Sequence, residues 1–371
     1  MRLINCATLG FEEFIGKQVP PYLILSHTWE TYEISYKDYC NIDDLRQESG
    51  LHVEKILKTC DIAKEKGYEY FWIDTCCIDK SSSAELTEAI NSMFKWYSRA
   101  ADCIVYLSDF DVRDPSADFA RCRWFTRGWT LQELIAPRQV RFYDSRWRYY
   151  GRRLNLAPEI SRITGIALSV ISGHFISRSH SIAERMSWAA HRETTREEDL
   201  AYCLFGIFGV NLPLLYGEGP RAFMRLQEEI LKASADLSIF AWRAEAPGTA
   251  FRGIFAHSVR EFAHAKSILS NPPSAQFAVT NRGLRIERPL LSSTGHNLPG
   301  NDAGFLMSLG CRYSHMAPTK HLAIWLKKLG PEGTLVRFSV DQLSIMDRKW
   351  PSSKEIDQLQ YIMRDTLAHE D

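Results

Sequence analysis

Short apolar runs alternate with helical patterns through about the first 150 residues of the chain. The runs have the length and character of buried strands, and they cover residues 22–26, 68–74, 103–107 and 140–143. Amphipathic patterns lie between them, with one apolar stripe from Val53 to Ala63 and another from Leu86 to Tyr97. Strands separated by helices in this way predict a parallel sheet covered by helices on both faces.

The remainder of the chain changes character twice. Helical patterns dominate residues 151–245, whereas short strand-like runs between Gly, Pro and Asn turns follow. We therefore expect an N-terminal domain of residues 1–245, made of an α/β core over about 1–150 and a helical part over about 151–245. A smaller, mainly β accessory domain is expected over residues 250–371.

Composition narrows the class of protein. Lysine and arginine together number 45, as do aspartate and glutamate, so the formal net charge is zero and nucleic acid is not an expected partner. The nine cysteines include no Cys-x-x-Cys pair, so we expect neither a disulfide framework nor a metal site. The longest apolar run, residues 200–210, is shorter than the roughly 20 residues of a membrane span. With no signal-peptide pattern, these features predict a cytoplasmic protein without a membrane span.

Polar and aromatic residues follow the first two predicted strands. Ligands of open parallel sheets bind at the carboxyl ends of the strands, and there lie Ser26, His27 and Trp29 after one strand and Asp74 and Asp79 after the next. Trp29 would stack on a flat ring, or it would pack at the edge of the core. The two aspartates would bind ribose hydroxyls, or they would order the loop through local hydrogen bonds.

Glu133 is the single acidic residue of the segment 122–137, which is rich in aromatic residues. Glu133 lies close to Arg127, Trp129 and Gln132, just before the fourth predicted strand. This pattern indicates a carboxylate on the first turns of a helix at the edge of the sheet, near a pocket. The alternative is an ordinary solvated acid on a helix surface.

Arginine is concentrated around this acid. Residues 121–153 contain nine Arg, no Lys and eight aromatic residues. The arginines would form a surface that pairs with the acids of residues 192–199, or Arg127 would bind a dinucleotide pyrophosphate through paired hydrogen bonds. Stacking and charge would also suit single-stranded nucleic acid, the least favoured of the three.

Several segments together resemble the fungal heterokaryon-incompatibility (HET) domain over about the first 240 residues. Lys80 departs from that family, which usually has Gln after Ile-Asp, and it places a cation beside Asp79. Residues from about 250 onward resemble the β-rich region that often follows HET domains. The segments that carry the resemblance are Tyr-Leu-Ile-Leu-Ser-His-Thr-Trp at 22–29, Trp-Ile-Asp-Thr-Cys-Cys-Ile-Asp at 72–79, Arg-Gly-Trp-Thr-Leu-Gln-Glu-Leu at 127–134, and residues 198–206 with 216–219.

The resemblance implies a role in fungal self/non-self recognition and programmed cell death. HET domains look like distant relatives of TIR domains, which implies a TIR-like, flavodoxin-like core. TIR enzymes have a corresponding Trp-Cys-x-x-Glu-Leu helix, whose Glu is the catalytic residue of NAD+ cleavage. The resemblance implies that Glu133 corresponds to this residue. The implied substrate is NAD+ or a related dinucleotide, with no resident cofactor. Self-association into a homo-oligomer and an upstream immune receptor are the implied partners.

Two functions stay open at this point. One is an enzyme that hydrolyses NAD+, and the other is a non-catalytic signalling module that acts by homotypic assembly. A catalytic site needs Glu133 open to a cleft with Trp129 and His27 nearby. An assembly interface needs an exposed apolar patch instead.

Overall fold

The chain is described by a computed structural model in which two compact units are distinguished. One unit contains Met1–Phe175 and Arg192–Leu214, and the other contains Ile176–His191 and Leu215–Asp371. The described residues are 1–16, 18–42, 45–173, 179–245, 251–270, 277–286, 290–293, 304–329, 333–347, 355–356 and 360–364.

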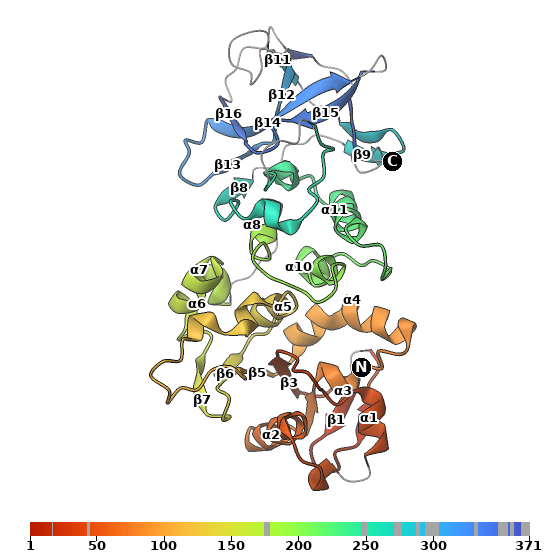
Figure 1. The fold of residues 1–371 in the computed structure, drawn as a ribbon, viewed down its shortest axis with the longest axis vertical. Helices are drawn as coiled ribbons and strands as arrows, with labels where there is room; N and C mark the ends of the chain where they lie inside the picture. The colour runs from red at the N-terminus through yellow and green to blue at the C-terminus, as the bar shows by residue number, and fades with distance from the viewer. Residues whose placement is uncertain are drawn as a thin grey trace. The chain divides into compact units, whose positions relative to one another are not determined.

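A seven-stranded sheet forms the centre of the first unit (Figure 1), in the order β2-β1-β4-β3-β5-β6-β7. The four predicted strands are confirmed as neighbours, and they pair in parallel. Three further strands at the two edges pair antiparallel, so the sheet is mixed. The parallel strands are β3 (Tyr22–His27), β4 (Tyr70–Trp72), β5 (Asp102–Tyr106) and β6 (Val140–Tyr143). The edge strands are β1 (Arg2–Asn5), β2 (Phe11–Glu13) and β7 (Tyr149–Arg152).

Helices lie on both sides of this sheet, with α2 on one side and α4 and α5 on the other in Figure 1. Local signals define the ends of two of these helices. Gly67, with φ +77°, follows α2, and Ser82 caps α4 by accepting a hydrogen bond from the Glu85 N–H. The helices of this unit are α1 (Tyr36–Asn41), α2 (Leu51–Glu65), α3 (Asp74–Cys77), α4 (Ser83–Arg99), α5 (Thr130–Ile135), α6 (Ala157–Thr164), α7 (Leu168–Ile171), α9 (Asp199–Tyr202) and α10 (Phe205–Phe208).

Glycine permits the close approach of α10 to α4. A Cβ built on Gly206 would lie 2.0 Å from the Cβ of Phe94, which is closer than two carbon atoms can approach. The two helices therefore pack with backbone against side chain, and a larger residue at this position would separate them.

The second unit is rich in β structure. Its main sheet has nine strands, and a separate pair joins β8 to β13. The expectation of a mainly β C-terminal region is confirmed for the described residues. Its strands are β8 (Ile268–Ser270), β9 (Phe277–Thr280), β10 (Gly283–Ile286), β11 (Leu290–Ser293), β12 (Gly304–Ser308), β13 (Cys311–Tyr313), β14 (Lys320–Leu329), β15 (Thr334–Phe338), β16 (Ser344–Asp347), β17 (Glu355–Ile356) and β18 (Gln360–Ile362). Two α-helices, α8 (Ile182–Ser187) and α11 (Arg221–Ala233), belong to the same unit, with short 3₁₀ helices at Leu237–Phe240 and Val259–Phe262.

A buried arginine fixes the strands of this unit to the segment before them. Arg337 of β15 is fully buried, and its guanidinium lies 3.7 Å from the ring centroid of Trp242. It donates to the carbonyl oxygens of Phe240 at 2.9 Å and of Trp242 at 2.6 Å. Desolvation and the positive charge of Arg252 lower the pKa of Arg337 to about 9, while the negative charge of Glu261 acts in the opposite direction.

The residues expected to form one helical part are shared between the units. Helices α6, α7, α9 and α10 lie in the first, and α8 and α11 lie in the second. The domain bounds at residues 245 and 250 stay a prediction, and residues 246–250 lie outside the described residues. In the part of the chain that the structure describes, no helix combines the length and apolar character needed to cross a membrane.

Candidate functional site

Glu133 lies on α5, which packs on β3. Its side chain is 7% exposed, and Ser26 at the end of β3 donates a hydrogen bond from Oγ to Oε2 at 2.5 Å. Trp124 donates in turn from Nε1 to Ser26 Oγ at 2.8 Å. The strand end, the helix and the buried indole therefore hold the carboxyl group in one position.

Burial decides the protonation state of this group. Desolvation raises the pKa of Glu133 to about 8, and the negative charge of Asp74 acts in the same direction. Hydrogen bonds from Ser26 and Tyr97 and the positive charge of Arg192 lower the pKa without offsetting the desolvation. At neutral pH the acid is therefore mainly protonated.

Arg192 is a buried neighbour that the sequence analysis did not single out. Its Nη1 donates to the carbonyl oxygen of Arg127 at 2.7 Å and to Thr130 Oγ1 at 2.8 Å, at the start of α5. Its Nη2 and the Nε2 of the buried Gln132 have no hydrogen-bond partner among the described residues. Because desolvation is its largest influence, the pKa of Arg192 is lowered to about 10.

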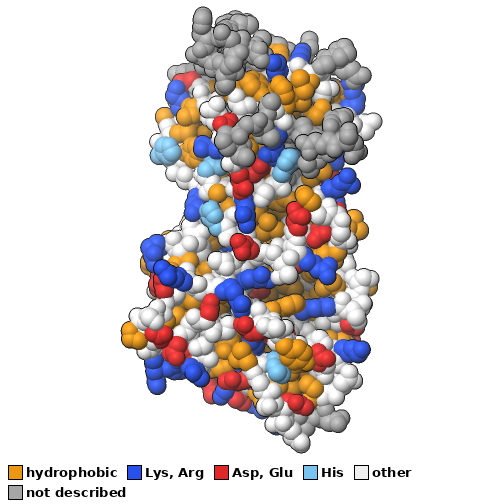
Figure 2. All heavy atoms as spheres, in the orientation of Figure 1, with side chains coloured by type: hydrophobic (Ala, Val, Ile, Leu, Met, Phe, Trp, Pro, Cys, Tyr) orange, Lys and Arg blue, Asp and Glu red, His pale blue; other side chains and the backbone are white. Residues whose placement is uncertain are grey.

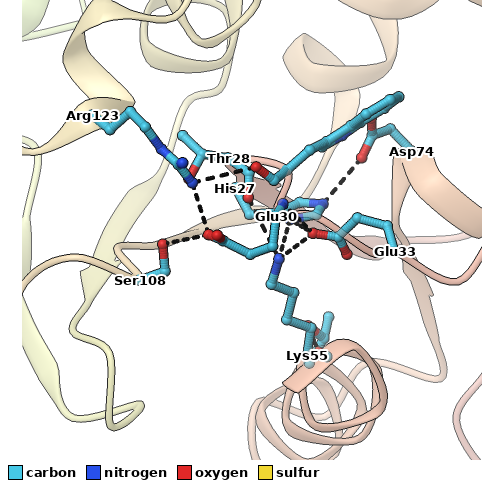
Figure 3. Close-up of polar contacts among 10 residues, drawn as sticks. His27, Thr28, Glu30, Glu33, Lys55, Asp74, Ser108 and Arg123 are labelled. Carbon is cyan, nitrogen blue, oxygen red and sulfur yellow. Dashed lines mark hydrogen bonds and ion pairs between the residues drawn. The ribbon is translucent and has the colours of Figure 1, made fainter. Parts of the chain in front are cut away.

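A second set of contacts begins at the next residue of β3 (Figure 3). His27 Nε2 lies 3.2 Å from Asp74 Oδ1, and Trp29 donates from Nε1 to Asp74 Oδ2 at 2.9 Å. Lys55, which is 2% exposed, reaches from α2 to within 3.2 Å of His27 Nδ1 and also pairs with Glu33. Successive residues of a strand point to opposite faces of the sheet. Ser26 therefore belongs to the contacts of Glu133, and His27 belongs to the contacts of Asp74, although the two residues are neighbours on β3.

Asp74 is the ionised member of this second set. Its desolvation opposes ionisation, but Lys80, His27 and Trp29 outweigh it and lower the pKa of Asp74 to about 2. The ammonium of Lys80 lies 3.6 Å from the ring centroid of Trp29. The carboxylate, the indole and the cation therefore form one surface cluster at the end of β4.

Lys55 and Glu33 were missed in the sequence because the only signal was weak. Lys55 lies within the apolar stripe of α2, where a single lysine more often extends its stem to reach water.

Further predicted residues make other contacts. Asp79 Oδ1 accepts from the Ser81 N–H at 2.9 Å and from Ser81 Oγ at 2.6 Å, which is the loop-ordering arrangement. Arg127 forms a backbone bridge with Glu193 and donates from Nη2 to Thr195 Oγ1 at 3.3 Å. Trp129 is half-buried immediately before α5. The structure therefore joins Ser26 to Glu133, and His27 and Trp29 to Asp74, while Asp79 and Arg127 bond elsewhere.

Besides the contacts of Arg127 with Glu193 and Thr195, the structure shows further partners for the arginine-rich segment of residues 121–153. Several of its arginines pair with acids from other parts of the same unit, because the strand ends bring those acids closer. These pairs are Arg123 with Glu30, Arg141 with Asp102, and Arg148 with Asp111 and Asp144. On the face drawn in Figure 2, acidic and basic side chains are interspersed.

Comparison with known proteins identifies the N-terminal part. The model of the family "Heterokaryon incompatibility protein (HET)" matches residues 22–115. The chain is also 51% identical, over 226 residues, to "Vegetative incompatibility protein HET-E-1" of Podospora anserina. The chain carries a heterokaryon-incompatibility domain. The alignment covers 58% of this chain but only 16% of HET-E-1.

The HET match covers part of the site. It contains β3, α2, β4 and β5, and so includes the cluster of His27, Trp29 and Asp74, whereas Glu133 lies beyond its end. A domain of unknown function (DUF8212) matches residues 221–258. No solved structure matches the chain.

An open pocket of about 450 Å³ lies at the segment that follows β5. Ser108 lines it, and this residue donates to Glu30 at 2.7 Å (Figure 3). Other lining residues include Asp109, Asp111 and Asp114, and Glu133 is not among them. No group of three or more His, Cys, Asp or Glu side chains suited to a metal ion occurs within the described ranges.

Proposed function

We propose that this HET domain acts in fungal self/non-self recognition by hydrolysing NAD+ to nicotinamide and ADP-ribose, and that loss of NAD+ drives cell death. The similarity to a vegetative incompatibility protein of Podospora anserina supports the biological role. The observation that carries the chemistry is the Glu133 carboxyl group, held by Ser26 where β3 ends. Ligands of open parallel sheets bind along this edge.

The order of the parallel strands supports a TIR-like, flavodoxin-like relationship. Numbered along the chain, the four parallel strands run 2-1-3-4 across the sheet, as β4-β3-β5-β6. In flavodoxin-like sheets the ligand binds at the point where the order of the strands reverses, between the first and third strands. Here that point lies between β3 and β5, and Glu30 and Ser108 meet across it.

The reaction breaks the bond between ribose C1′ and the nicotinamide nitrogen. The electron pair leaves on nitrogen, so nicotinamide departs neutral and an oxocarbenium-like ribosyl cation remains. A carboxylate at Glu133 stabilises that cation, water adds at C1′, and the carboxylate takes the proton that the water loses. Because the nicotinamide ring of NAD+ is itself cationic, its approach favours the ionised form of Glu133.

The pH dependence of the reaction follows from the carboxyl group. In the free protein the pKa of Glu133 is raised to about 8, so the reactive carboxylate increases as pH rises toward and through that value. We expect kcat/KM, which reports on the free protein, to rise with pH from 6 through 8 and to level off only above that value.

The test is incubation of concentrated protein with NAD+, followed by chromatography for nicotinamide and ADP-ribose. Glu133→Gln keeps the shape of the protonated acid but has no carboxylate, and we expect its rate to fall by at least 100-fold. Glu65→Gln changes an exposed glutamate of α2 and serves as the matched control. Equal rates for wild type and Glu133→Gln would remove the assigned role.

One observation favours a second function. Glu133 is only 7% exposed, and its carboxyl group already has a hydrogen-bond donor in Ser26. In a non-catalytic module that signals by homotypic assembly, the role of this acid is structural. Glu133→Gln would then retain incompatibility in living hyphae. Loss of incompatibility together with NAD+ hydrolysis would instead favour the enzyme.

A further inference from the structure

The indole of Trp29 is exposed and yet held in place. It is 48% exposed, although an exposed aromatic ring forgoes the free energy that burial would give it. Its Nε1 donates to Asp74 Oδ2 at 2.9 Å, which fixes the plane of the ring. A fixed aromatic surface at the ligand edge of a sheet is suited to binding a partner by its face.

Buried groups determine this orientation. The ammonium of Lys55 has only donors, so its contact with His27 Nδ1 at 3.2 Å requires a free lone pair on that nitrogen. The ring proton therefore lies on Nε2, which donates to Asp74 Oδ1 at 3.2 Å. Both oxygens of Asp74 thus accept hydrogen bonds, one from His27 and one from Trp29, and the indole cannot turn without breaking this sequence of contacts.

A cation of the chain itself already occupies the ring. The Lys80 ammonium lies 3.6 Å from the Trp29 centroid, at cation–π distance. Lys80 is an exposed residue, so water can solvate its ammonium once it leaves the ring. The neighbouring Asp74 carboxylate adds negative charge to the same place, and a second cation of suitable shape can therefore replace Lys80.

We propose that the face of Trp29 binds the cationic pyridinium ring of a nicotinamide nucleotide, and that Lys80 is an internal competitor which occupies this face in the free protein. The identity of the ligand rests on the proposed function. The arrangement discriminates by charge, because the reduced, neutral ring of NADH lacks the attraction that displaces Lys80. Lys80 therefore sets the affinity and the selectivity of the site for the oxidised form.

The probe for this inference is the 1-methylnicotinamide cation, which carries the pyridinium ring but no ribose to cleave. Its affinity for the whole chain is measured by ligand-observed NMR, with neutral nicotinamide in parallel. We expect Lys80→Gln to bind the cation about two- to five-fold more tightly, the range expected for one exposed cation–π contact. Lys95→Gln removes an equal charge from an exposed position on α4 and should leave the affinity unchanged.

Substitutions of Trp29 itself provide a second test of the same site. Trp29→Leu should abolish binding of the cation, whereas Trp29→Phe retains an aromatic face without the Asp74 bond and should bind more weakly. Neutral nicotinamide should gain less from Lys80→Gln than the cation does, because it gains the freed ring face but no relief from charge repulsion, and it should not respond to Lys95→Gln. Unchanged or weaker binding of the cation by Lys80→Gln, or full binding by Trp29→Leu, overturns the inference.

The two proposals fail in distinguishable ways. Binding of 1-methylnicotinamide involves no hydrolysis, so a protein that never cleaves NAD+ can still show the Lys80 and Trp29 effects; the inference then stands and the enzyme proposal fails. Hydrolysis of NAD+ with cation affinity unaffected by either substitution refutes the inference alone.

Discussion

At the scale of single residues, Glu133 makes the stability of the protein depend on pH. Its pKa is raised from 4.5 to about 8 by burial, so between these values the folded state binds a proton that the unfolded state has lost. The stability contribution is complete below pH 4.5 and is lost as pH rises toward 8. The slope is about 1.4 kcal/mol for each pH unit in this window.

Glu133→Gln therefore stabilises the fold at high pH. The amide cannot ionise, and its oxygen can accept the Ser26 hydrogen bond. We expect the variant to match wild type at pH 5 and to unfold at a higher denaturant concentration at pH 8. Urea unfolding at both pH values measures the difference, with Glu65→Gln as the exposed control. A difference that is the same at pH 5 and pH 8 contradicts the assigned burial of the charge.

Residue-scale features were predictable where they follow from strand order. Ser26, His27, Trp29 and Asp74 were found because they follow strands that the apolar runs define. The hydrogen bonds and ion pairs around these residues were not predictable. Lys55 and Arg192 reach the site from segments whose folded positions no local pattern reveals. The burial of Glu133 is likewise a property of the packed helix, and the sequence equally allowed a solvated acid.

At the scale of elements, the contact of α10 with α4 depends on Gly206, which has no side chain. We expect Gly206→Ala to destabilise the fold by about 1–3 kcal/mol, because its Cβ would overlap the Phe94 Cβ and the helices must separate. Thermal unfolding measures the loss. The control is Gly209→Asn, because Gly209 has φ +69° with nothing near its Cβ position, and Asn tolerates this conformation. Similar losses for both variants would argue against overlap as the cause.

The elements of the sheet were predictable to different extents. The four parallel strands coincide with apolar runs between amphipathic helical patterns, so their existence follows from the sequence alone. Strands β1 and β7 pair with the outer edges of β4 and β6, and β2 pairs in turn with β1. Such pairing depends on the assembled sheet, which is why the antiparallel edges were not predicted.

At the scale of the whole molecule, each of the two units is built from two separate stretches of the sequence. The stretch Ile176–His191 belongs to the second unit, although the chain on either side of it belongs to the first. Its helix α8 contacts the 3₁₀ helix Val259–Phe262 and the strand β8. Both of these partners follow residue 245, the predicted end of the N-terminal domain.

A fragment of residues 1–245 should therefore expose the apolar face of α8. Ile182 and Met186 are fully buried in the whole chain, and the fragment lacks β8 and Val259–Phe262, two of the elements that α8 contacts. We expect the fragment to bind a hydrophobic dye and to self-associate more than the whole chain, as followed by dye fluorescence and light scattering. Ile182→Ser with Met186→Ser should reduce both signals in the fragment. A monomeric fragment that binds no dye contradicts this expectation.

The position of β3 limits how the site can move. This strand has parallel partners along both edges, β4 on one side and β5 on the other, so its backbone shifts only if the centre of the sheet shifts. The sheet therefore holds Ser26 and His27 in place, and any opening of the site has to involve elements other than β3. A displacement of α5 away from β3 would carry Glu133 away from a fixed hydroxyl group, so uncovering the acid in this way and breaking its Ser26 hydrogen bond are one event.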